Sequence, residues 1–261
     1  MRPRVIPVLL LDSRRRLVKT LNFRDEKYVG DPFNVIRLFN EKEVDEICVL
    51  DIEASSHGRK PDRGFLRELA SECFMPLGYG GGIAEPVDAE NLFSVGIEKV
   101  VIGEHAADTS LITALVNNFG TQAVAACMDC RQVPGGHGVF VRRATRKVSD
   151  DPVTYARDLE AAGVGEIILQ NVDRDGARTG FDNELIWRVS VAVGVPVVAL
   201  GGAGRLAHLA EGLAVGASAV ASGSAFVFLG RLRAVLINYP TAPELDSLSS
   251  SNLFTEARNG S

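Results

Sequence analysis

Short apolar runs alternate with longer amphipathic segments along almost the whole chain. The apolar runs are unbroken, which is typical of strands buried on both faces of a parallel sheet. The predicted strands are residues 5–11, 46–52, 75–79, 99–103, 123–128, 166–170, 196–200 and 217–222. The predicted helices between them are residues 31–42, 62–73, 85–95, 107–119, 151–162, 183–193 and 204–215. This alternation predicts an α/β protein in which helices cover a parallel sheet.

An open doubly wound sheet and a closed (β/α)8 TIM barrel both fit this alternation. The strand count, the length of 261 residues and an internal symmetry favour the barrel. Glycine runs start at residues 80 and 201, after the third and seventh strands, and their separation is close to half of the chain. We therefore predict a duplicated half-barrel that forms one domain over residues 1–242. A hairpin insertion is expected at 132–147, and a polar, Ser-rich, flexible tail at 243–261.

Composition excludes several classes of protein. The chain is 46% hydrophobic, with a net charge of −5, which argues against a protein that wraps a nucleic acid. Its apolar runs are much shorter than the roughly 20 residues that span a bilayer, and the N-terminus lacks the pattern of a secretory signal. We therefore expect a cytoplasmic protein with neither a nucleic-acid nor a membrane partner.

The sequence gives little support for a metal or redox site. Cys127 and Cys130 form a C-x-x-C pair, but the pair lies at the end of a strand-like run and has no second ligand pair. The four histidines share neither a helix spacing nor a strand end. We expect no metal and no cofactor.

Chemistry in such a barrel is expected at the carboxyl ends of the strands. The glycine-rich stretches 80–82 and 201–204, and Gly223 with Ser224, would let backbone N–H groups approach a phosphate, although tight turns alone also use glycine. Carboxylates for proton transfer are Asp51, Asp129, Asp173 and Asp175, and Asp129 is the leading candidate because it ends an apolar strand. Asp173 could instead form an ion pair or cap a loop.

Four charged residues stand at the opposite ends of the strands. Arg4, Glu46, Lys99 and Glu166 begin the first, second, fourth and sixth predicted strands. Two cations and two carboxylates could form a ring across the barrel floor, or each could simply be solvated.

Several stretches together resemble the cyclase subunit, of HisF type, of the imidazole glycerol phosphate synthase family. They are residues 4–7, 51–55, 80–83, 165–169, 173–176 and 201–204. The resemblance covers nearly all of residues 3–240 and implies a (β/α)8 fold with a glutaminase subunit docked on the barrel floor. It also implies that Arg4, Glu46, Lys99 and Glu166 gate a passage for ammonia. A phosphate-bearing substrate would contact Gly81, Gly82, Asp175, Gly176, Gly202, Gly223 and Ser224.

The sequence also departs from that family. The family uses two aspartates as general acid and base; Asp129 matches one, but Leu10 stands at the position of the other. Asparagine and threonine donors of a second phosphate site align with Gly103 and Glu104, and a carboxylate there would repel phosphate. The chain is more similar to paralogues found with surface-polysaccharide genes, whose first strand has a run of leucines like residues 9–11 and whose end resembles residues 234–240. That similarity implies a further partner, a sugar amidotransferase that converts an N-acetyl group into an acetamidino group.

Three hypotheses follow. The first is a synthase subunit that passes ammonia to a changed substrate for surface polysaccharide, with Asp129 as the proton-transfer residue and Lys19 and Asp173 assisting. The second is a non-catalytic conduit that activates a glutaminase. The third, histidine biosynthesis proper, requires Asp12 to fold back and replace the missing acid.

Overall fold

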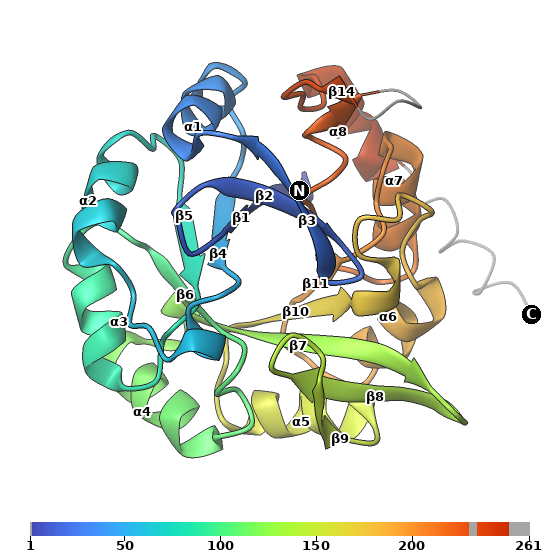
Figure 1. Ribbon diagram of the computed structural model, residues 1–261. Helices are drawn as coiled ribbons and strands as arrows, with labels where there is room; N and C mark the ends of the chain where they lie inside the picture. Colours follow the sequence, from blue (N-terminus) through green and yellow to red (C-terminus); the bar gives the residue numbers. More distant parts are fainter. Residues whose placement is uncertain (1, 230–233, 251–261) are drawn as a thin grey trace, which may run out of the picture.

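The structure, a computed structural model, describes residues 2–229 and 234–250. Within this part of the chain eight parallel strands close into a barrel, with helices on the outside (Figure 1). In order around the ring they are β1 (Arg4–Leu11), β4 (Ile47–Asp51), β5 (Leu77–Gly80), β6 (Lys99–Ile102), β7 (Val124–Val133), β10 (Glu166–Asn171), β11 (Val197–Leu200) and β12 (Ala219–Ser222). β12 pairs with β1 and closes the ring, which confirms the predicted (β/α)8 barrel.

Seven helices connect successive barrel strands. They are α1 (Pro32–Glu41), α2 (Arg63–Ser71), α3 (Pro86–Phe93), α4 (Thr109–Phe119), α5 (Pro152–Ala161), α6 (Asn183–Ser190) and α7 (Leu206–Ala214). An aspartate side chain accepts a hydrogen bond from the first turn of five of them, namely Asp31, Asp62, Asp108, Asp151 and Asp182. These caps satisfy backbone donors that no helical carbonyl can reach, and so they fix where each helix begins.

The apolar core has two layers because side chains alternate across each barrel strand. In β1, Val5 and Leu9 pack outward under the helices, whereas Ile6 and Val8 pack inside the barrel. Leu10 follows the inward series and packs at the carboxyl end of the barrel interior. The alternation therefore places a leucine on the inward face of β1 at the open, carboxyl end of the barrel.

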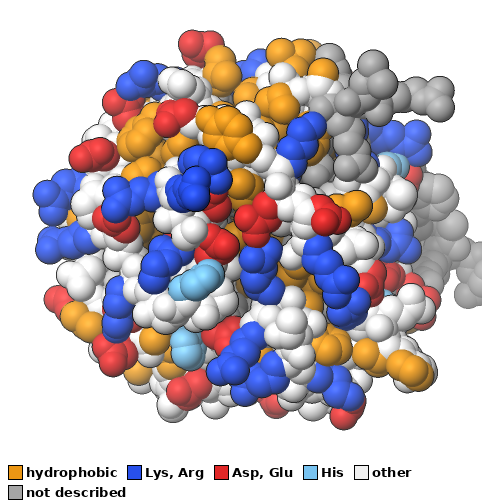
Figure 2. All heavy atoms as spheres, viewed as in Figure 1, with side chains coloured by type: hydrophobic (Ala, Val, Ile, Leu, Met, Phe, Trp, Pro, Cys, Tyr) orange, Lys and Arg blue, Asp and Glu red, His pale blue; other side chains and the backbone are white. Residues whose placement is uncertain are grey.

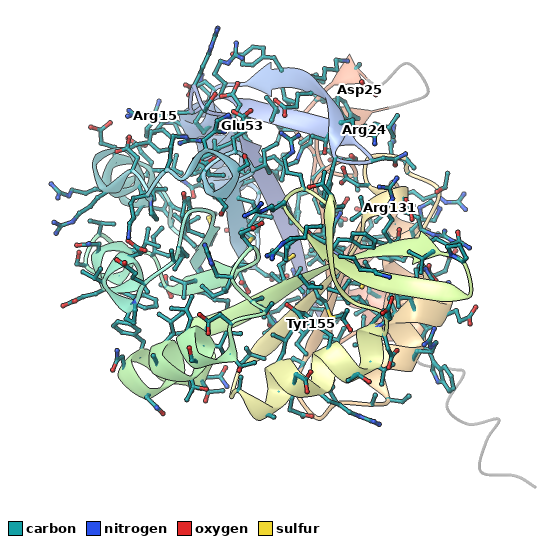
Figure 3. The ribbon with its side chains drawn as sticks, turned by 60° about the horizontal axis from the view of Figure 1, so that its bottom comes forward. Arg15, Arg24, Asp25, Glu53, Arg131 and Tyr155 are labelled. Carbon is teal, nitrogen blue, oxygen red and sulfur yellow. The ribbon has the colours of Figure 1, made fainter. Side chains whose placement is uncertain are left out.

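Two hairpins rise from the carboxyl end of the barrel (Figure 1). The first consists of β2 (Leu17–Leu21) and β3 (Arg24–Gly30), joined by a turn at residues 22–23, and Arg24 and Asp25 begin β3 (Figure 3). The sequence pattern did not predict it, because β3 is mostly exposed and has no apolar alternation. In the second, β7 continues beyond the barrel and pairs with β8 (Gly136–Val141), which pairs with β9 (Arg146–Ser149). This confirms the predicted hairpin insertion, and Tyr155 of α5 lies beneath its strands (Figure 3).

The C-terminal segment differs in part from the prediction of a flexible tail from residue 243. Residues Ala242–Ser250 form α8, and Leu245 and Leu248 are buried. Two leucines three residues apart form one short apolar face, which the many serines around them conceal in the sequence. Residues 251–261 of the predicted tail lie outside the described residues. Before α8, the Tyr239 hydroxyl donates a hydrogen bond to the Val5 carbonyl oxygen at 2.8 Å, which ties this segment to β1.

The remaining elements are short. They are the 3-10 helices η1 (Ser55–His57), η2 (Thr121–Ala123) and η3 (Val172–Arg174), and the paired strands β13 (Phe228–Leu229) and β14 (Ala234–Val235). None of the helices in the described ranges has both the length and the apolar character needed to cross a bilayer.

Candidate functional site

A cavity opens at the carboxyl ends of the barrel strands, between the two hairpins. We call it the mouth cavity, and Figure 2 shows Lys and Arg side chains on several sides of the central hollow, with Asp and Glu side chains between them. Most of the predicted site residues line this cavity. They are Lys19, Gly81, Gly82, Asp129, Asp175, Gly176, Gly202, Gly223 and Ser224.

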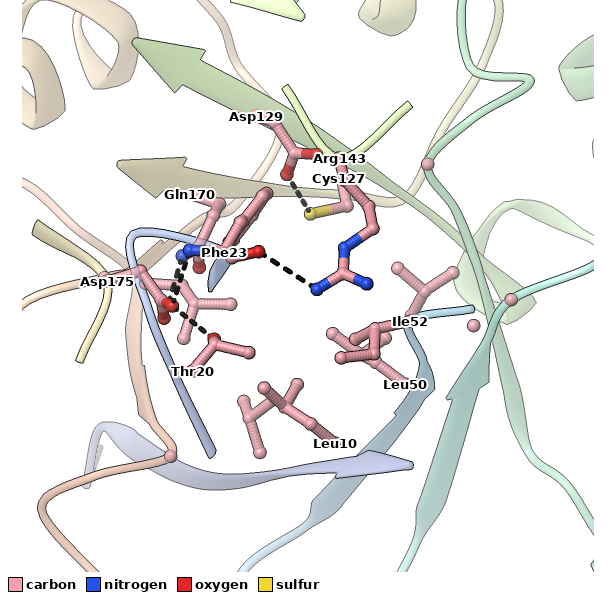
Figure 4. A pocket seen from close by; sticks show the side chains of 18 of the residues that line it. Leu10, Thr20, Phe23, Leu50, Ile52, Cys127, Asp129, Arg143, Gln170 and Asp175 are labelled. Atoms are coloured by element: carbon pink, nitrogen blue, oxygen red, sulfur yellow. Dashed lines mark hydrogen bonds between the residues drawn. The ribbon is translucent and has the colours of Figure 1, made fainter. Parts of the chain in front are cut away.

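Asp129 projects into the mouth cavity from β7 (Figure 4). Burial raises the pKa of its carboxyl group to about 7, and the charges of Asp175 and Glu104 add to the effect. The Cys127 thiol donates to Asp129 Oδ1 at 3.7 Å, which opposes the rise. A carboxyl group with a pKa near neutrality can both accept and donate a proton, as general acid–base catalysis requires.

Lys19 lies in β2, on the first hairpin, and its side chain is buried. Burial lowers the pKa of its amine to about 8, while the nearby charge of Asp175 acts in the opposite direction. Its Nζ donates a hydrogen bond to the Val8 carbonyl oxygen at 2.6 Å. Lys19 is therefore a fixed amine that can exchange a proton near neutral pH.

Asp175 connects the end of the sixth barrel strand to the first hairpin. Its carboxylate accepts hydrogen bonds from Thr20 Oγ1 at 2.6 Å and Gln170 Nε2 at 3.5 Å (Figure 4). Burial raises the pKa of Asp175, although these hydrogen bonds act against the rise. Asp175 thus holds in place the hairpin that carries Lys19.

Backbone lines the cavity beyond β11 and β12, at a place that we call the glycine corner (Gly202, Gly223 and Ser224). A Cβ atom on Gly202 would lie 2.1 Å from the Gly180 carbonyl oxygen, and its φ of +112° is strained for any other residue. A Cβ atom on Gly223 would lie 2.4 Å from Lys19 Nζ. A bound group can therefore approach the main chain here, in the part of the barrel where phosphate groups commonly bind.

Two aspartates lie elsewhere than the predictions required. Asp173 is outside the residues that line the mouth cavity; its carboxylate accepts from Arg131 Nε at 3.2 Å and from the Gln132 backbone N–H at 2.7 Å. It anchors the second hairpin, and the prediction that it assists catalysis has no support in this position. Asp12 is held in the β1–β2 turn by Arg14 and Arg16 and does not line the cavity, whereas Leu10 does. Asp12 therefore does not take the place of the missing first-strand acid.

Glu104, which was predicted to repel phosphate, lines the mouth cavity and is paired with basic groups. Glu104 accepts hydrogen bonds from the Arg142 backbone N–H at 2.6 Å and from Arg142 Nε at 3.3 Å, and Arg146 Nη2 lies 4.0 Å from it. These basic groups of the second hairpin reduce the repulsion that Glu104 exerts on an anion, although its charge still helps to raise the pKa of Asp129. The insertion at 132–147 contains several basic residues, but its sequence has no pattern that shows the hairpin folding back over the mouth, so none of them was predicted to belong to the site.

The four charged residues of the barrel floor form a closed ring, which we call the floor ring. Glu46 accepts from Arg4 Nη1 at 2.6 Å and from Lys99 Nζ at 3.0 Å. Glu166 accepts from Arg4 Nη2 and from Lys99 Nζ, the latter at 3.2 Å. Burial lowers the pKa of Arg4, but the two glutamates outweigh it and the pKa is raised overall. The predicted ring is thus present, with each cation bound by both carboxylates.

Apolar side chains fill most of the barrel between the floor ring and the mouth cavity. The interior is lined by Ile6, Val8, Cys48, Leu50, Gly78, Val101, Ile168, Val198, Leu200 and Ala221. Such a lining favours a small neutral molecule over an ion, because an ion would lose its hydration without compensation.

Comparisons with known proteins agree with this architecture. Residues 4–232 match the family described as histidine biosynthesis protein. A Pseudomonas aeruginosa protein, provisionally named imidazole glycerol phosphate synthase subunit hisF2, is 51% identical over 94% of this chain and 98% of its own length. A Leptospira borgpetersenii protein, provisionally named as the HisF subunit, is 40% identical over 95% and 99%. The Corynebacterium glutamicum (strain R) protein named imidazole glycerol phosphate synthase subunit HisF is 36% identical over 86% and 90%. The chain therefore belongs to the histidine biosynthesis protein family, and within it to the proteins of HisF type.

Proposed function

We propose that this chain is the ammonia-using synthase subunit of a glutamine-dependent enzyme of the imidazole glycerol phosphate synthase type. A separate glutaminase docks on the barrel floor and releases ammonia beneath the floor ring. The ammonia crosses the barrel interior as a neutral molecule and reaches a phosphate-bearing substrate in the mouth cavity.

The floor ring is the observation that carries this proposal. A closed ring of two cations and two carboxylates lies at the end of the barrel opposite Asp129, and apolar side chains fill the space between them. An apolar interior is general to (β/α)8 barrels, so the distinguishing feature is the charged ring that closes this interior at one end. A gate for a small neutral molecule explains both features, and it agrees with the names of the related proteins.

At the mouth, the glycine corner holds the phosphate, and Asp129 moves the proton. Because its pKa is raised, a substantial fraction of the Asp129 carboxyl groups is protonated near neutral pH. The group can therefore either donate or accept a proton. Lys19 assists, because its amine is fixed beside the glycine corner and has a lowered pKa.

Leu10 favours a second candidate, in which the same barrel serves a different ammonia acceptor. The cavity has a leucine on the inward face of β1, and the nearby Asp12 is bound within its own turn. An acid–base pair that requires a carboxylate from β1 is therefore incomplete. In this second candidate the chain supplies ammonia for amidination of an N-acetyl sugar in surface-polysaccharide synthesis, together with a sugar amidotransferase.

One assay separates the two candidates. The purified chain is given ammonium and the ribulosyl aminoimidazole carboxamide nucleotide, and imidazole glycerol phosphate is measured with time. Steady product formation that is abolished in Asp129→Asn supports the first candidate. If the wild type forms no product and Leu10→Asp does, the missing carboxylate of β1 explains the lack of activity, and this result supports the second candidate. Unchanged product formation by Asp129→Asn would contradict the role of this residue.

A further inference from the structure

An arginine from the second hairpin reaches back over the mouth cavity. Arg143 lies in the turn between β8 and β9, and it lines the cavity on the side of Leu50 and Ile52 (Figure 4). The glycine corner belongs to another part of the rim, beyond β11 and β12. The two features could therefore contact different groups of one bound molecule.

The turn that carries Arg143 is held in a strained conformation. Arg142, Arg143 and Ala144 have φ values of +54°, +53° and +60°, in the left-handed region that such residues rarely adopt. Thr145 fixes the turn with a hydrogen bond from its Oγ1 to the Arg142 carbonyl oxygen at 2.6 Å, and Glu104 accepts the Arg142 N–H. Strain that is maintained by several contacts is common where a side chain must point in one direction.

Contacts with the first hairpin orient the guanidinium. Arg143 Nη2 donates to the Phe23 carbonyl oxygen at 2.9 Å and to Glu26 Oε1 at 2.8 Å. Among the described residues both protein partners of Arg143 are bound through this one nitrogen. A guanidinium has five N–H donors in a planar fork, so Nη1 and Nε remain to bind a ligand.

We infer that Arg143 is a specificity-determining residue that binds a second anionic group of the substrate, a phosphate or a carboxylate. The inference rests on the proposed function, because the first anionic group is the phosphate at the glycine corner. Pairing with Arg142, and with Arg146 at 4.0 Å, reduces the repulsion of an anion by Glu104 on this side of the cavity. The donors come from the hairpin and not from the end of β6, where Gly103 and Glu104 offer no side-chain donor.

Binding of simple anions tests the inference without any turnover. Calorimetry compares fructose 1,6-bisphosphate with fructose 6-phosphate, and 3-phosphoglycerate with glycerol 3-phosphate. In one of the two pairs we expect the wild type to bind the compound with two anionic groups (fructose 1,6-bisphosphate or 3-phosphoglycerate) at least about tenfold more tightly than its partner with one. Charge-assisted hydrogen bonds from the guanidinium to the second group would give such a difference. The first pair identifies a second phosphate and the other pair a carboxylate. Arg143→Ala should bind both members of that pair equally, whereas Arg157→Ala, which removes an arginine from the outer surface of α5, should keep the preference.

Glu26→Gln distinguishes ligand binding from a structural bridge between the hairpins. It weakens the bridge but keeps the Arg143 side chain, so the preference for the two-anion compound should remain within about threefold. Equal loss of the preference in Glu26→Gln and Arg143→Ala would overturn the inference. Equal binding of both members by the wild type overturns it as well and leaves the glycine corner intact. Failure to bind any of the four compounds overturns the phosphate site of the proposed function and this inference with it.

Discussion

Replacement of Asp129 by asparagine should stabilise the protein at alkaline pH and have little effect on stability in acid. The carboxyl group has a pKa of about 7 in the folded chain, and burial is the main cause. The pKa in the unfolded chain is about 3.9. Between these two values the folded state binds more protons than the unfolded state, so the free energy of unfolding falls as the pH rises. Burial of the charged carboxylate thus lowers the free energy of unfolding. This loss is absent below both pKa values and reaches its full size above pH 7.

The size of the effect follows from the two pKa values. Three pKa units at about 1.36 kcal/mol each give about 4 kcal/mol as the full penalty. Asp129 lines an open cavity, and its side chain is only partly buried, so water reduces this figure. We expect Asp129→Asn to exceed the wild type by about 1–3 kcal/mol at pH 8 and by less than about 0.5 kcal/mol at pH 4.

Urea unfolding of both proteins at half-unit steps from pH 4 to pH 9 measures this difference. Asp173→Asn is a matched control, because it also removes one carboxylate from the same end of the barrel. Its NH2 group replaces one of the two oxygens that accept from Arg131 and Gln132, so it loses one of these hydrogen bonds and should be less stable than the wild type. A difference between Asp129→Asn and the wild type that stays constant over this range would refute the reasoning, because a raised pKa of Asp129 requires the difference to grow between pH 4 and pH 7.

Three further variants test other parts of the molecule. Gly202→Ala should lose about 1–3 kcal/mol of stability and bind inorganic phosphate at least tenfold more weakly, because its Cβ would overlap the Gly180 carbonyl oxygen; normal phosphate affinity by calorimetry would exclude the glycine corner. Lys99→Met should lower the yield of product per glutamine hydrolysed by severalfold while the rate with free ammonium stays near that of the wild type; equal losses in both assays would argue against a gate. Tyr239→Phe should cost about 1 kcal/mol in urea unfolding, since the Val5 carbonyl oxygen loses its hydroxyl donor, and an unchanged midpoint would show that this contact is not stabilising.

The sequence predicted the barrel well because the barrel depends on a regular pattern. Strands buried on both faces must be apolar throughout, and each is followed by a helix with one apolar face. The order of the strands and helices can therefore be predicted from the hydrophobic pattern. The floor ring could also be predicted in part. Arg4, Lys99 and Glu166 begin their strands and Glu46 directly precedes β4, and parallel strands bring such positions to one end of the barrel.

The mouth of the barrel was harder to predict because loops and hairpins build it. Lys19 reaches the cavity on a hairpin whose outer strand is polar and exposed. This hairpin therefore has no hydrophobic periodicity from which it could be predicted. The roles of Asp173 and Asp175 could not be separated by their spacing in the sequence. They are two residues apart, yet only Asp175 turns into the cavity. The position of Arg143 depends on a left-handed turn at residues 142–144. None of these residues is a glycine, so the sequence does not indicate this conformation.

The closed pairing of the floor ring also restricts how this protein can evolve. Each glutamate binds both cations and each cation binds both glutamates, so the four charges cancel as a group. A single neutral substitution leaves an odd charge in contact with an apolar interior, and a single reversal leaves three like charges around one opposite charge. Drift at these four positions is therefore expected to proceed through paired changes, with a poorly tolerated intermediate between them. If the floor ring gates ammonia as proposed, a lineage that no longer needs this gate would be recognised by the loss of an oppositely charged pair.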